Sequence, residues 1–312
     1  MKKLFLCVGA AKTGTTWLYR NLEAHPDLWF TPEKELNYFF SKYGAFNRLT
    51  PLARNRKLEI MRAMRDDPDR KLDAAEQKFV WFAQQDEGAA AIHWYERFAS
   101  GRITDHWYRG LFAGMPEGAW ACDFSPSTSL TPAETWPRIA HFADEVRIVY
   151  ILREPCERLW SHAKFHARFI GKLDEFAAMG ADEVKAFVDQ FKLAGDGDYG
   201  AHLARIYAAI PRKNVLVIDY RDISNRPEKA LRRVEAHLGL SRGARRPDLM
   251  TGRINPSDEI ARPEWFCGAY GERFAEDANL LLDQGVRFAR PWARRYGRRV
   301  GWRRRLRQEL RF

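Results

Sequence analysis

A short segment near the start of the chain combines residue types that bind phosphate groups. Residues 9–16 read Gly-Ala-Ala-Lys-Thr-Gly-Thr-Thr and lie between an apolar run at residues 4–8 and a helical pattern. Glycines allow backbone N–H groups to face inward, and the start of a helix adds partial positive charge. Lys12 adds a full charge, and hydroxyl groups add hydrogen-bond donors on Thr13, Thr15 and Thr16. We predict that this turn binds an anion; the alternative is an ordinary glycine-containing turn between a strand and a helix.

The spacing of the two glycines also matches that of a Walker A motif, but the position of the lysine does not. Lys12 lies inside the loop, and Thr15 stands where the Walker A motif has its lysine. Residues 215–219, four apolar residues and an acid, resemble a Walker B strand. A nucleotide-dependent kinase or NTPase is therefore the nearest alternative enzyme, and dependence on magnesium and ATP would favour it.

A second group of polar residues follows the apolar run at residues 146–152. Arg153 ends this run, Pro155 begins a helical pattern, and Ser161 lies eight residues after Arg153. An arginine at the carboxyl end of a central parallel strand lies where α/β folds bind ligands, and its planar guanidinium suits phosphate. At 100° per residue, Ser161 lies opposite the apolar face of this helix, together with Arg158, so it need not be part of the core. The alternative for Arg153 is a structural ion pair with a nearby acid.

The alternation of strand and helix patterns predicts the fold that carries these motifs. Helical patterns alternate with four apolar runs, at residues 4–8, 120–123, 146–152 and 214–219. This order is typical of an α/β fold with a mainly parallel sheet and helices on both of its faces. We expect one domain over residues 1–292, with residues 28–40 extended and a helical insertion at about residues 52–113. The aromatic residues of the insertion are expected in the core, and the alternative is stacking on a sugar, for Trp81, Trp94, Tyr95, Trp107 and Tyr108.

Taken together, the two motifs resemble those of sulfotransferases that use 3′-phosphoadenosine 5′-phosphosulfate (PAPS). Residues 12–18 are similar to the family's 5′-phosphosulfate loop, and Arg153 and Ser161 match the positions that hold the 3′-phosphate. The resemblance covers about residues 3–292. It implies a P-loop-like three-layer fold, PAPS as the sulfuryl donor and no metal. It also implies donor-binding residues, namely Lys12, Thr13, Gly14, Thr15, Thr16, Trp17, Arg153 and Ser161.

The segment at residues 31–40 resembles the Lys-Glu-x-x-x-Phe segment of the carbohydrate (heparan-type) branch of that family. The resemblance implies that Lys34 contacts the transferred group and that Glu35 is the catalytic base. Glu33 is the competing base because alternate residues of an extended segment point the same way. A solvated group of charges is the structural alternative, and a histidine remains open as the base, with three candidates at His25, His162 and His166.

The acceptor is less well defined by the sequence. At residues 123–128 the heparan-type pattern is altered, because Phe124 replaces a lysine and Thr128 replaces a tyrosine. We expect a hydroxyl or amine acceptor on a carbohydrate or glycolipid, and the altered pattern argues against an acidic polysaccharide.

Positive charge is concentrated at the end of the chain. The net charge is +11, and residues 287–312 hold eleven arginines and one acid, which leaves residues 1–286 near +1. We treat residues 293–312 as a basic tail that contacts an anionic membrane or polyanion, without specific binding of nucleic acid. Trp292, Tyr296 and Trp302 lie between the arginines, as in stacking or interfacial segments. The alternative is a solvated helix or an oligomer contact, and the oligomeric state stays open.

The cysteines and the N-terminus bear on the cellular location. Four cysteines are widely spaced, which argues against a disulfide scaffold or a zinc site and suits a reducing compartment. The apolar start of the chain is interpreted as a buried strand and not as a signal peptide. We therefore expect a cytoplasmic protein, peripheral at the membrane if the basic tail binds there.

Overall fold

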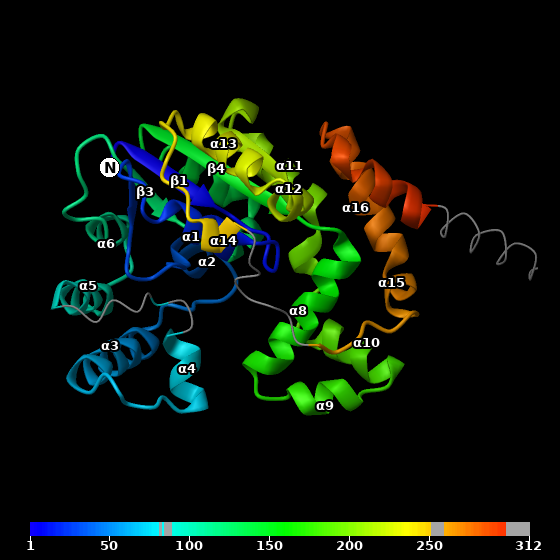
Figure 1. Ribbon diagram of the computed structural model, residues 1–312, viewed down its shortest axis with the longest axis horizontal. Coiled ribbons are helices and arrows are strands. Elements are labelled where there is room, and N and C mark those ends of the chain that lie inside the picture. The colour runs from blue at the N-terminus through cyan, green and yellow to red at the C-terminus, as the bar shows by residue number, and fades with distance from the viewer. Residues whose placement is uncertain (81–82, 84–88, 251–258, 298–312) are drawn as a thin grey trace, which may run out of the picture.

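One sheet brings the two sequence motifs to neighbouring strands. The computed structural model describes residues 1–80, 83, 89–250 and 259–297. In these residues the strands form an all-parallel sheet in the order β2-β3-β1-β4-β5 (Figure 1). The strands are β1 (Lys3–Cys7), β2 (Leu28–Phe30), β3 (Trp120–Asp123), β4 (Glu145–Leu152) and β5 (Val215–Asp219). The predicted parallel sheet is therefore confirmed.

Helices connect the strands, and η marks a short 3₁₀ helix. Before β3 the chain forms α1 (Thr15–Leu22), α2 (Tyr38–Tyr43), α3 (Pro51–Asp66), α4 (Ala74–Val80), α5 (Ala89–Ala99) and α6 (Asp105–Gly110). Between β3 and β5 lie η1 (Pro126–Leu130), η2 (Ala133–Thr135), α7 (Trp136–Ala140), α8 (Pro155–Phe169), α9 (Leu173–Ala178), α10 (Ala181–Gln190), η3 (Gly195–Gly197), α11 (Tyr199–Ala209) and η4 (Arg212–Asn214). After β5 come α12 (Tyr220–Asn225), α13 (Pro227–Leu238), α14 (Pro247–Met250), α15 (Phe266–Ala269), α16 (Gly271–Asp283) and η5 (Arg287–Ala289).

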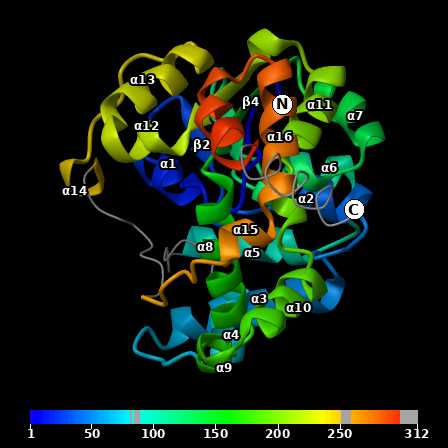
Figure 2. The same cartoon turned by 90° about the vertical axis from the view of Figure 1, so that its right-hand side faces the viewer.

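Both faces of the sheet are buried, each in its own apolar cluster. Successive side chains of a strand point to opposite faces, so Leu4 and Leu6 of β1 join one cluster and Phe5 joins the other. Helices α1, α12 and α13 supply the cluster around Phe5, and α2, α7, α8, α11 and α16 supply the cluster around Leu6. Helix α16 packs on α11 at the edge of this second layer (Figure 2). The predicted three-layer α/β fold is therefore confirmed.

The strand order creates one place where connections leave in opposite directions. The chain passes from β1 through α1 to β2 on one side, whereas β4 is followed by β5 on the other side. In open α/β sheets, ligands bind at the carboxyl ends of strands that flank such a reversal. Here those strands are β1 and β4, which end at the phosphate loop and at Arg153.

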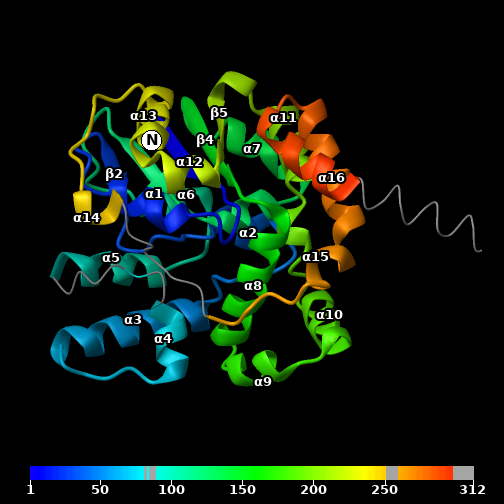
Figure 3. The same cartoon turned by 45° about the vertical axis from the view of Figure 1, so that its right-hand side comes forward.

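The predicted helical insertion is present as α3, α4, α5 and α6. Helices α3–α5 lie on the same side of the sheet as α8–α10, and α8 leads there directly from β4 (Figures 1 and 3). Four of the predicted core aromatics are buried, namely Trp94, Tyr95, Trp107 and Tyr108. The fifth, Trp81, lies outside the described residues. The expectation of core packing is confirmed for the four.

The aromatic end of the segment at residues 28–40 was expected to be extended and is not. Only Leu28–Phe30 form a strand, and Tyr38, Phe39 and Phe40 begin α2. Asn37 adopts a left-handed conformation (φ 53°) that turns the chain into this helix. Tyr38 then stacks on Tyr108 with 4.5 Å between ring centroids. Tertiary packing of the aromatic rings therefore outweighs their local preference for strands.

The prediction that cysteine usage excludes disulfides is wrong for one pair. Cys156, at the start of α8, forms a disulfide with Cys267 of α15, whereas Cys7 and Cys122 are buried thiols. The two bonded cysteines are 111 residues apart, so their spacing carries no local signal. The argument from cysteine usage for a reducing compartment loses its basis, and the cytoplasmic location stays a prediction. In the part of the chain that the structure describes, no helix is both long and apolar enough to cross a membrane.

The first part of the predicted basic tail packs on the domain. Trp292 and Tyr296 are buried, with 4% and 0% of their surfaces exposed, and Tyr296 lies 5.1 Å from the Phe274 ring. A stacking or interfacial role is therefore wrong for these two rings, because the domain itself covers them. The arginines around them are exposed, at positions Arg287, Arg290, Arg294 and Arg295. Trp302 lies outside the described residues, and contact with an anionic surface stays a prediction.

Candidate active site

The phosphate loop continues the pairing of β1 with β4 and then turns sharply. Val8 N–H donates to Val149 O at 3.0 Å, and Ala10 N–H donates to Ile151 O at 2.9 Å. Gly9 (φ 123°) and Gly14 (φ 91°) then adopt conformations that favour glycine. A Cβ on Gly9 would lie 3.1 Å from a backbone oxygen of η1, and one on Gly14 would lie 3.2 Å from the ring of Tyr220. Both glycines are therefore required by backbone conformation and by crowding.

Of the loop side chains predicted to bind the donor, two have structural contacts and two lie at the start of a helix. The Thr13 hydroxyl donates to Ala10 O at 2.7 Å, so this fully buried side chain closes the turn. Thr15 and Thr16 begin α1, whose N-terminus lies at the loop. Trp17 belongs to the apolar cluster beneath the sheet. Thr13 and Trp17 therefore have structural contacts, the start of α1 lies at the loop, and donor binding by these residues stays a prediction.

Lys12 and Arg153 connect the loop to α8. The Lys12 ammonium lies 4.1 Å from the centroid of the Phe165 ring on α8. An Arg153 Nη atom donates to Lys12 O at 3.4 Å, and the guanidinium lies 4.8 Å from the Tyr220 ring centroid. Arg153 also pairs with Glu157 at 3.4 Å, with 22% of its side chain exposed. The ion-pair alternative is therefore present, yet the same arginine also contacts the phosphate loop.

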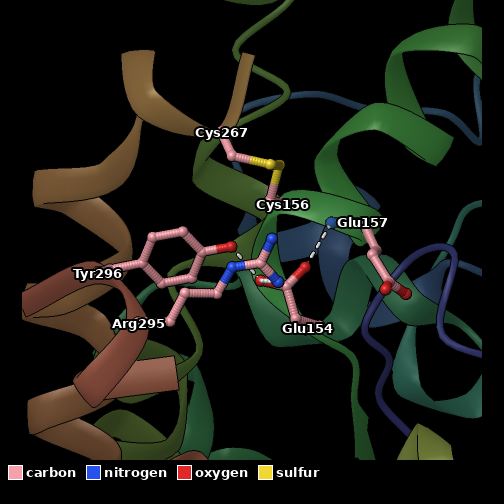
Figure 4. Close-up of a disulfide and its surroundings, with 6 residues drawn as sticks. All are labelled: Glu154, Cys156, Glu157, Cys267, Arg295 and Tyr296. Carbon is pink, nitrogen blue, oxygen red and sulfur yellow. Dashed lines mark hydrogen bonds and ion pairs between the residues drawn. A yellow bond between two sulfur atoms is a disulfide. The ribbon is translucent and has the colours of Figure 1, made fainter. Parts of the chain in front are cut away.

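Contacts from distant parts of the chain fix the residues after Arg153. The Glu154 carboxylate accepts the Glu157 N–H at 2.8 Å, which caps α8, and it also accepts the hydroxyl of Tyr296 (Figure 4). Arg295 lies 3.8 Å from the same carboxylate, and the Cys156–Cys267 disulfide is next along the chain (Figure 4). The start of α8, and with it Arg153, is therefore held by the C-terminal part of the domain.

Ser161 lies further along α8 and is buried, with 6% exposed. The expectation of a less buried helix face around it is wrong, because Arg158 on that face is 1% exposed. Arg158 donates to Leu193 O at 2.9 Å and lies 3.1 Å from His162 Nδ1. Among the described residues, no hydrogen bond joins Ser161 to Arg153. The structure therefore brings Lys12 and Arg153 together and leaves the binding role of Ser161 a prediction.

Lys34 and Glu35 lie next to the phosphate loop. Their charged groups are 3.2 Å apart, and their side chains are only 7% and 8% exposed. Burial raises the pKa of the Cys7 thiol to about 12, and the charges of Lys34, Glu35 and Asp123 also act on it. Cys7 is the last residue of β1, and Asp123 pairs with Leu6 in the neighbouring strand. Phe124 N–H donates to Lys34 O at 3.3 Å, so the Lys34–Glu35 pair lies at the same end of the sheet as the loop. The alternative of a solvated group of charges is therefore wrong.

Glu33, the competing candidate for the general base, is paired with a lysine of the insertion and not with Lys34. Its carboxylate is 1% exposed and accepts a hydrogen bond from Lys57 of α3 at 2.6 Å. Burial is the main effect that raises the pKa of Glu33, and the charge of Lys57 opposes it. Glu33 therefore attaches the insertion to this segment.

The three candidate histidines lie in different surroundings. His25 Nε2 lies 3.1 Å from Ser241 O, and His166 packs on the Phe191 ring at 4.2 Å between ring centroids. His162 Nδ1 lies 3.1 Å from the Arg158 guanidinium, and burial with the charges of Arg158 and Lys12 holds the pKa of His162 well below the usual range. An imidazole with so low a pKa is a weak general base. His162 is therefore the weaker candidate, and Glu35 stays the predicted base.

Asp123 is a site residue that the sequence analysis did not single out. It ends β3, is 1% exposed, and lies beside Leu6 of β1 in the sheet. Burial raises the pKa of its carboxyl to about 6, and the charge of Glu35 adds to this effect. The available sequence signal was its place at the carboxyl end of a strand, two residues before the Ser-Pro of the altered pattern.

The acid of the possible Walker B strand has a structural role. Asp219 caps α12 by accepting the Arg221 N–H at 2.9 Å, and it pairs with the Arg221 guanidinium at 2.7 Å. Within residues 1–80, 89–250 and 259–297, no group of three or more His, Cys, Asp or Glu side chains forms a candidate metal site.

Comparison with known proteins decides between the enzyme classes. The sulfotransferase family profile matches residues 5–243. The protein belongs to the sulfotransferase family. This match spans the phosphate loop, Lys34, Glu35 and the start of α8, and it confirms the predicted PAPS-dependent sulfotransferase over the kinase alternative. Among curated protein sequences, no relative matches the chain.

Solved sulfotransferases share the fold. A sulfotransferase from Alicyclobacillus acidocaldarius is 22% identical with a TM-score of 0.57, and the alignment covers 90% of this chain and 94% of that chain. The sulfotransferase domain from the curacin biosynthetic pathway is 14% identical with a TM-score of 0.49, over 80% of this chain and 77% of that domain. The corresponding domain of the Synechococcus PCC 7002 olefin synthase is 14% identical with a TM-score of 0.42, over 83% and 82%. The first similarity supports the three-layer sulfotransferase fold.

Proposed function

We propose that this sulfotransferase transfers a sulfuryl group from PAPS to a hydroxyl or amine of a carbohydrate or glycolipid, with Glu35 as the general base. The observation that carries the proposal is the arrangement at the ends of β1, β3 and β4. There Arg153 contacts the phosphate loop, and the buried Lys34–Glu35 pair is bonded to the end of β3, which lies next to β1 in the sheet. We call residues 9–16 with Arg153 the donor side, and residues 31–37 with residues 123–127 the acceptor side.

The donor side fits a nucleotide that carries phosphate groups at two positions. Backbone N–H groups of the loop and the start of α1 suit the 5′-phosphosulfate, because a helix N-terminus attracts anions. The Arg153 guanidinium, at the end of the adjacent strand, suits the 3′-phosphate, with Ser161 as the further contact that the family resemblance implies. PAPS, when bound, supplies an activated sulfuryl group joined to a good leaving group.

Sulfuryl transfer requires mainly alignment and neutralisation of charge, as phosphoryl transfer does. Glu35 takes the proton of the acceptor hydroxyl while the new O–S bond forms. Lys12 and the N–H groups of the loop stabilise the negative charge that grows on the phosphate oxygen as the old S–O bond breaks. Lys34, whose ammonium lies 3.2 Å from the Glu35 carboxylate, contacts the transferred group in this proposal, as the family resemblance implies.

The surroundings of Phe124 favour an acceptor without strong negative charge. Phe124 is fully buried and packs edge-on against Phe5 and Tyr19, at 5.3 Å and 5.5 Å between ring centroids. Phe124 stands where the heparan-type pattern has a lysine. This position therefore adds an apolar side chain to the core and no positive charge to the acceptor side. A neutral sugar of a carbohydrate or glycolipid fits this acceptor side better than an acidic polysaccharide.

Replacement of Glu35 by glutamine tests the proposal. The Glu35→Gln enzyme should lose turnover by about 10²–10⁴-fold, the usual contribution of a general base. Its affinity for adenosine 3′,5′-bisphosphate should stay unchanged, because Glu35 lies on the acceptor side. Turnover is measured with radiolabelled PAPS and a panel of neutral p-nitrophenyl glycosides.

Glu33→Gln serves as the matched variant, since it removes a carboxylate two residues away that already pairs with Lys57. Wild-type turnover by Glu35→Gln, or a larger loss by Glu33→Gln in an enzyme that still folds, would overturn the assignment of the base.

A further inference from the structure

The segment that carries Lys34 and Glu35 lies outside the helices and strands, although Glu33 forms an isolated β-bridge with Ala83. It lies between the end of β2 at Phe30 and the start of α2 at Tyr38. A general base must lie within about 2.6–3.2 Å of the proton that it abstracts. Contacts with other segments must therefore fix the backbone on both sides of Glu35.

Two of these contacts come from the end of β3. Phe124 N–H donates to Lys34 O at 3.3 Å, directly before Glu35. The backbone of Leu36, directly after Glu35, lies close enough to Asp123 to lower the pKa of its carboxyl, which burial raises. The backbone on either side of the proposed base is therefore attached to the strand that lies next to β1.

A chain of side-chain hydrogen bonds extends this attachment. The Ser125 hydroxyl donates to Asp123 Oδ1 at 2.5 Å, and its oxygen accepts the Asn37 N–H at 2.8 Å. The Asn37 side-chain amide donates to Glu35 O at 3.0 Å, and its oxygen accepts the Ser127 hydroxyl. The backbone from Lys34 to Asn37 is thus bonded repeatedly to residues 123–127.

The carboxylate of Asp123 sets the direction of these bonds. An ionised carboxylate only accepts hydrogen bonds, and Asp123 receives them from the Ser125 hydroxyl and, at 3.0 Å, from the Tyr108 hydroxyl. A serine has a single hydroxyl hydrogen, so donation to Asp123 leaves the Ser125 oxygen to accept from Asn37. An amide in place of Asp123 would turn a donor toward groups that are themselves donors.

We propose that Asp123, acting through Ser125, is a positioning residue that holds the Lys34–Glu35 segment in the geometry needed for proton abstraction. This inference rests on the proposed role of Glu35 as the base. Asp123 itself does not touch the acceptor. Its contribution is the placement of Glu35, and a misplacement of about 1 Å can reduce a rate by on the order of 10²-fold.

Serine variants separate positioning from simple structural support. Ser125→Ala should reduce turnover by about 10–10²-fold while the affinity for adenosine 3′,5′-bisphosphate stays unchanged. Ser125→Thr keeps the hydroxyl and should restore most of this turnover. Ser129→Ala is the matched control, because Ser129 is an equally buried serine in the same segment whose hydroxyl donates to Pro126 O instead. It should behave as the wild type.

Amide hydrogen exchange gives a readout that needs no acceptor. The amide hydrogens of Leu36 and Asn37 should exchange faster in Ser125→Ala and in the isosteric Asp123→Asn than in the wild type. In Ser129→Ala they should exchange at the wild-type rate. Exchange and turnover must change together in the variants that break the chain of bonds. A loss of nucleotide affinity or of the folded state in proportion to turnover would instead assign Asp123 and Ser125 a structural role and overturn the inference.

Different results would overturn the positioning role of Asp123 and the proposed function with Glu35 as the base. Wild-type turnover by Ser125→Ala and Asp123→Asn, alongside an inactive Glu35→Gln, overturns the positioning role and leaves the proposed function in place. Full turnover by Glu35→Gln overturns the proposed function itself.

Discussion

On the donor side, the binding groups lie on turns that directly follow two neighbouring strands, whereas on the acceptor side Lys34 and Glu35 lie outside any helix or strand. The phosphate loop continues the β1–β4 ladder, and Arg153 is the first residue after β4. The acceptor side depends instead on bonds between residues as distant as Asn37 and Ser125, which are 88 positions apart. Donor binding is therefore encoded locally, and the placement of the base is encoded by tertiary contacts.

The two sides also differ in solvation. Arg153 is partly exposed, with 22% of its side chain accessible, while Glu33, Lys34, Glu35 and Asp123 are nearly buried. Charges interact more strongly where water is excluded. The acceptor side is therefore more sensitive to small changes in geometry, and the donor side is more tolerant of them.

On the donor side, the largest effect on turnover is expected at Lys12. Lys12→Ala should reduce turnover by about 10²–10³-fold, because it removes a positive charge that stabilises the leaving phosphate oxygen. Lys3→Ala is the matched control, since Lys3 lies at the opposite end of the same strand. Steady-state rates with saturating PAPS measure the effect. Equal rates for Lys12→Ala and Lys3→Ala would remove the loop lysine from the donor side.

The smallest effect on turnover is expected at Asp277, which supports the donor side from a distance. Asp277 accepts the Gly200 N–H at 2.7 Å at the start of α11, and the first residue of that helix, Tyr199, donates its hydroxyl to Arg153 O at 3.1 Å. Burial raises the pKa of the Asp277 carboxyl to about 7. Because this value lies above that of an unfolded aspartate, about 3.9, the folded state binds the proton more tightly.

The wild type should therefore lose stability relative to Asp277→Asn as the pH rises from about 4 to about 7, by on the order of 1 kcal/mol for each pH unit. Urea unfolding of both proteins across this range measures the difference, and turnover should change little. A difference in the free energy of unfolding that is independent of pH would show that Asp277 is not the buried acid described here.

Most of the donor side could be predicted from the sequence because its signals are local. The apolar run that became β4, the arginine after it and the proline that begins α8 occupy consecutive positions. The glycines and Lys12 of the phosphate loop are equally close together. For such segments, backbone preference and ligand chemistry point to the same conformation.

The remaining features could not be predicted because their partners are far apart in the chain. Tyr296 reaches Glu154 across 142 positions, and Cys156 reaches Cys267 across 111. Helical periodicity placed Arg158 on an outer face, but α8 is covered on that side as well, where Leu193 O accepts its hydrogen bond. The role of Asp123 was missed for the same reason, since its donor Tyr108 is 15 positions away and Ser125, its other donor, bonds to Asn37 across 88 positions.

We infer that the donor side binds the nucleotide and that the acceptor side does not contribute to the affinity for it. Titration calorimetry with adenosine 3′,5′-bisphosphate tests it on the wild type, Arg153→Ala and Glu35→Gln, with Arg147→Ala from the opposite end of β4 as the control. We predict binding to the wild type, unchanged binding to Glu35→Gln and Arg147→Ala, and about 10–100-fold weaker binding to Arg153→Ala, from a charged hydrogen bond of about 1.5–3 kcal/mol. Absence of binding to the folded wild type at about 1 mM nucleotide, or undiminished binding to Arg153→Ala, would contradict the account.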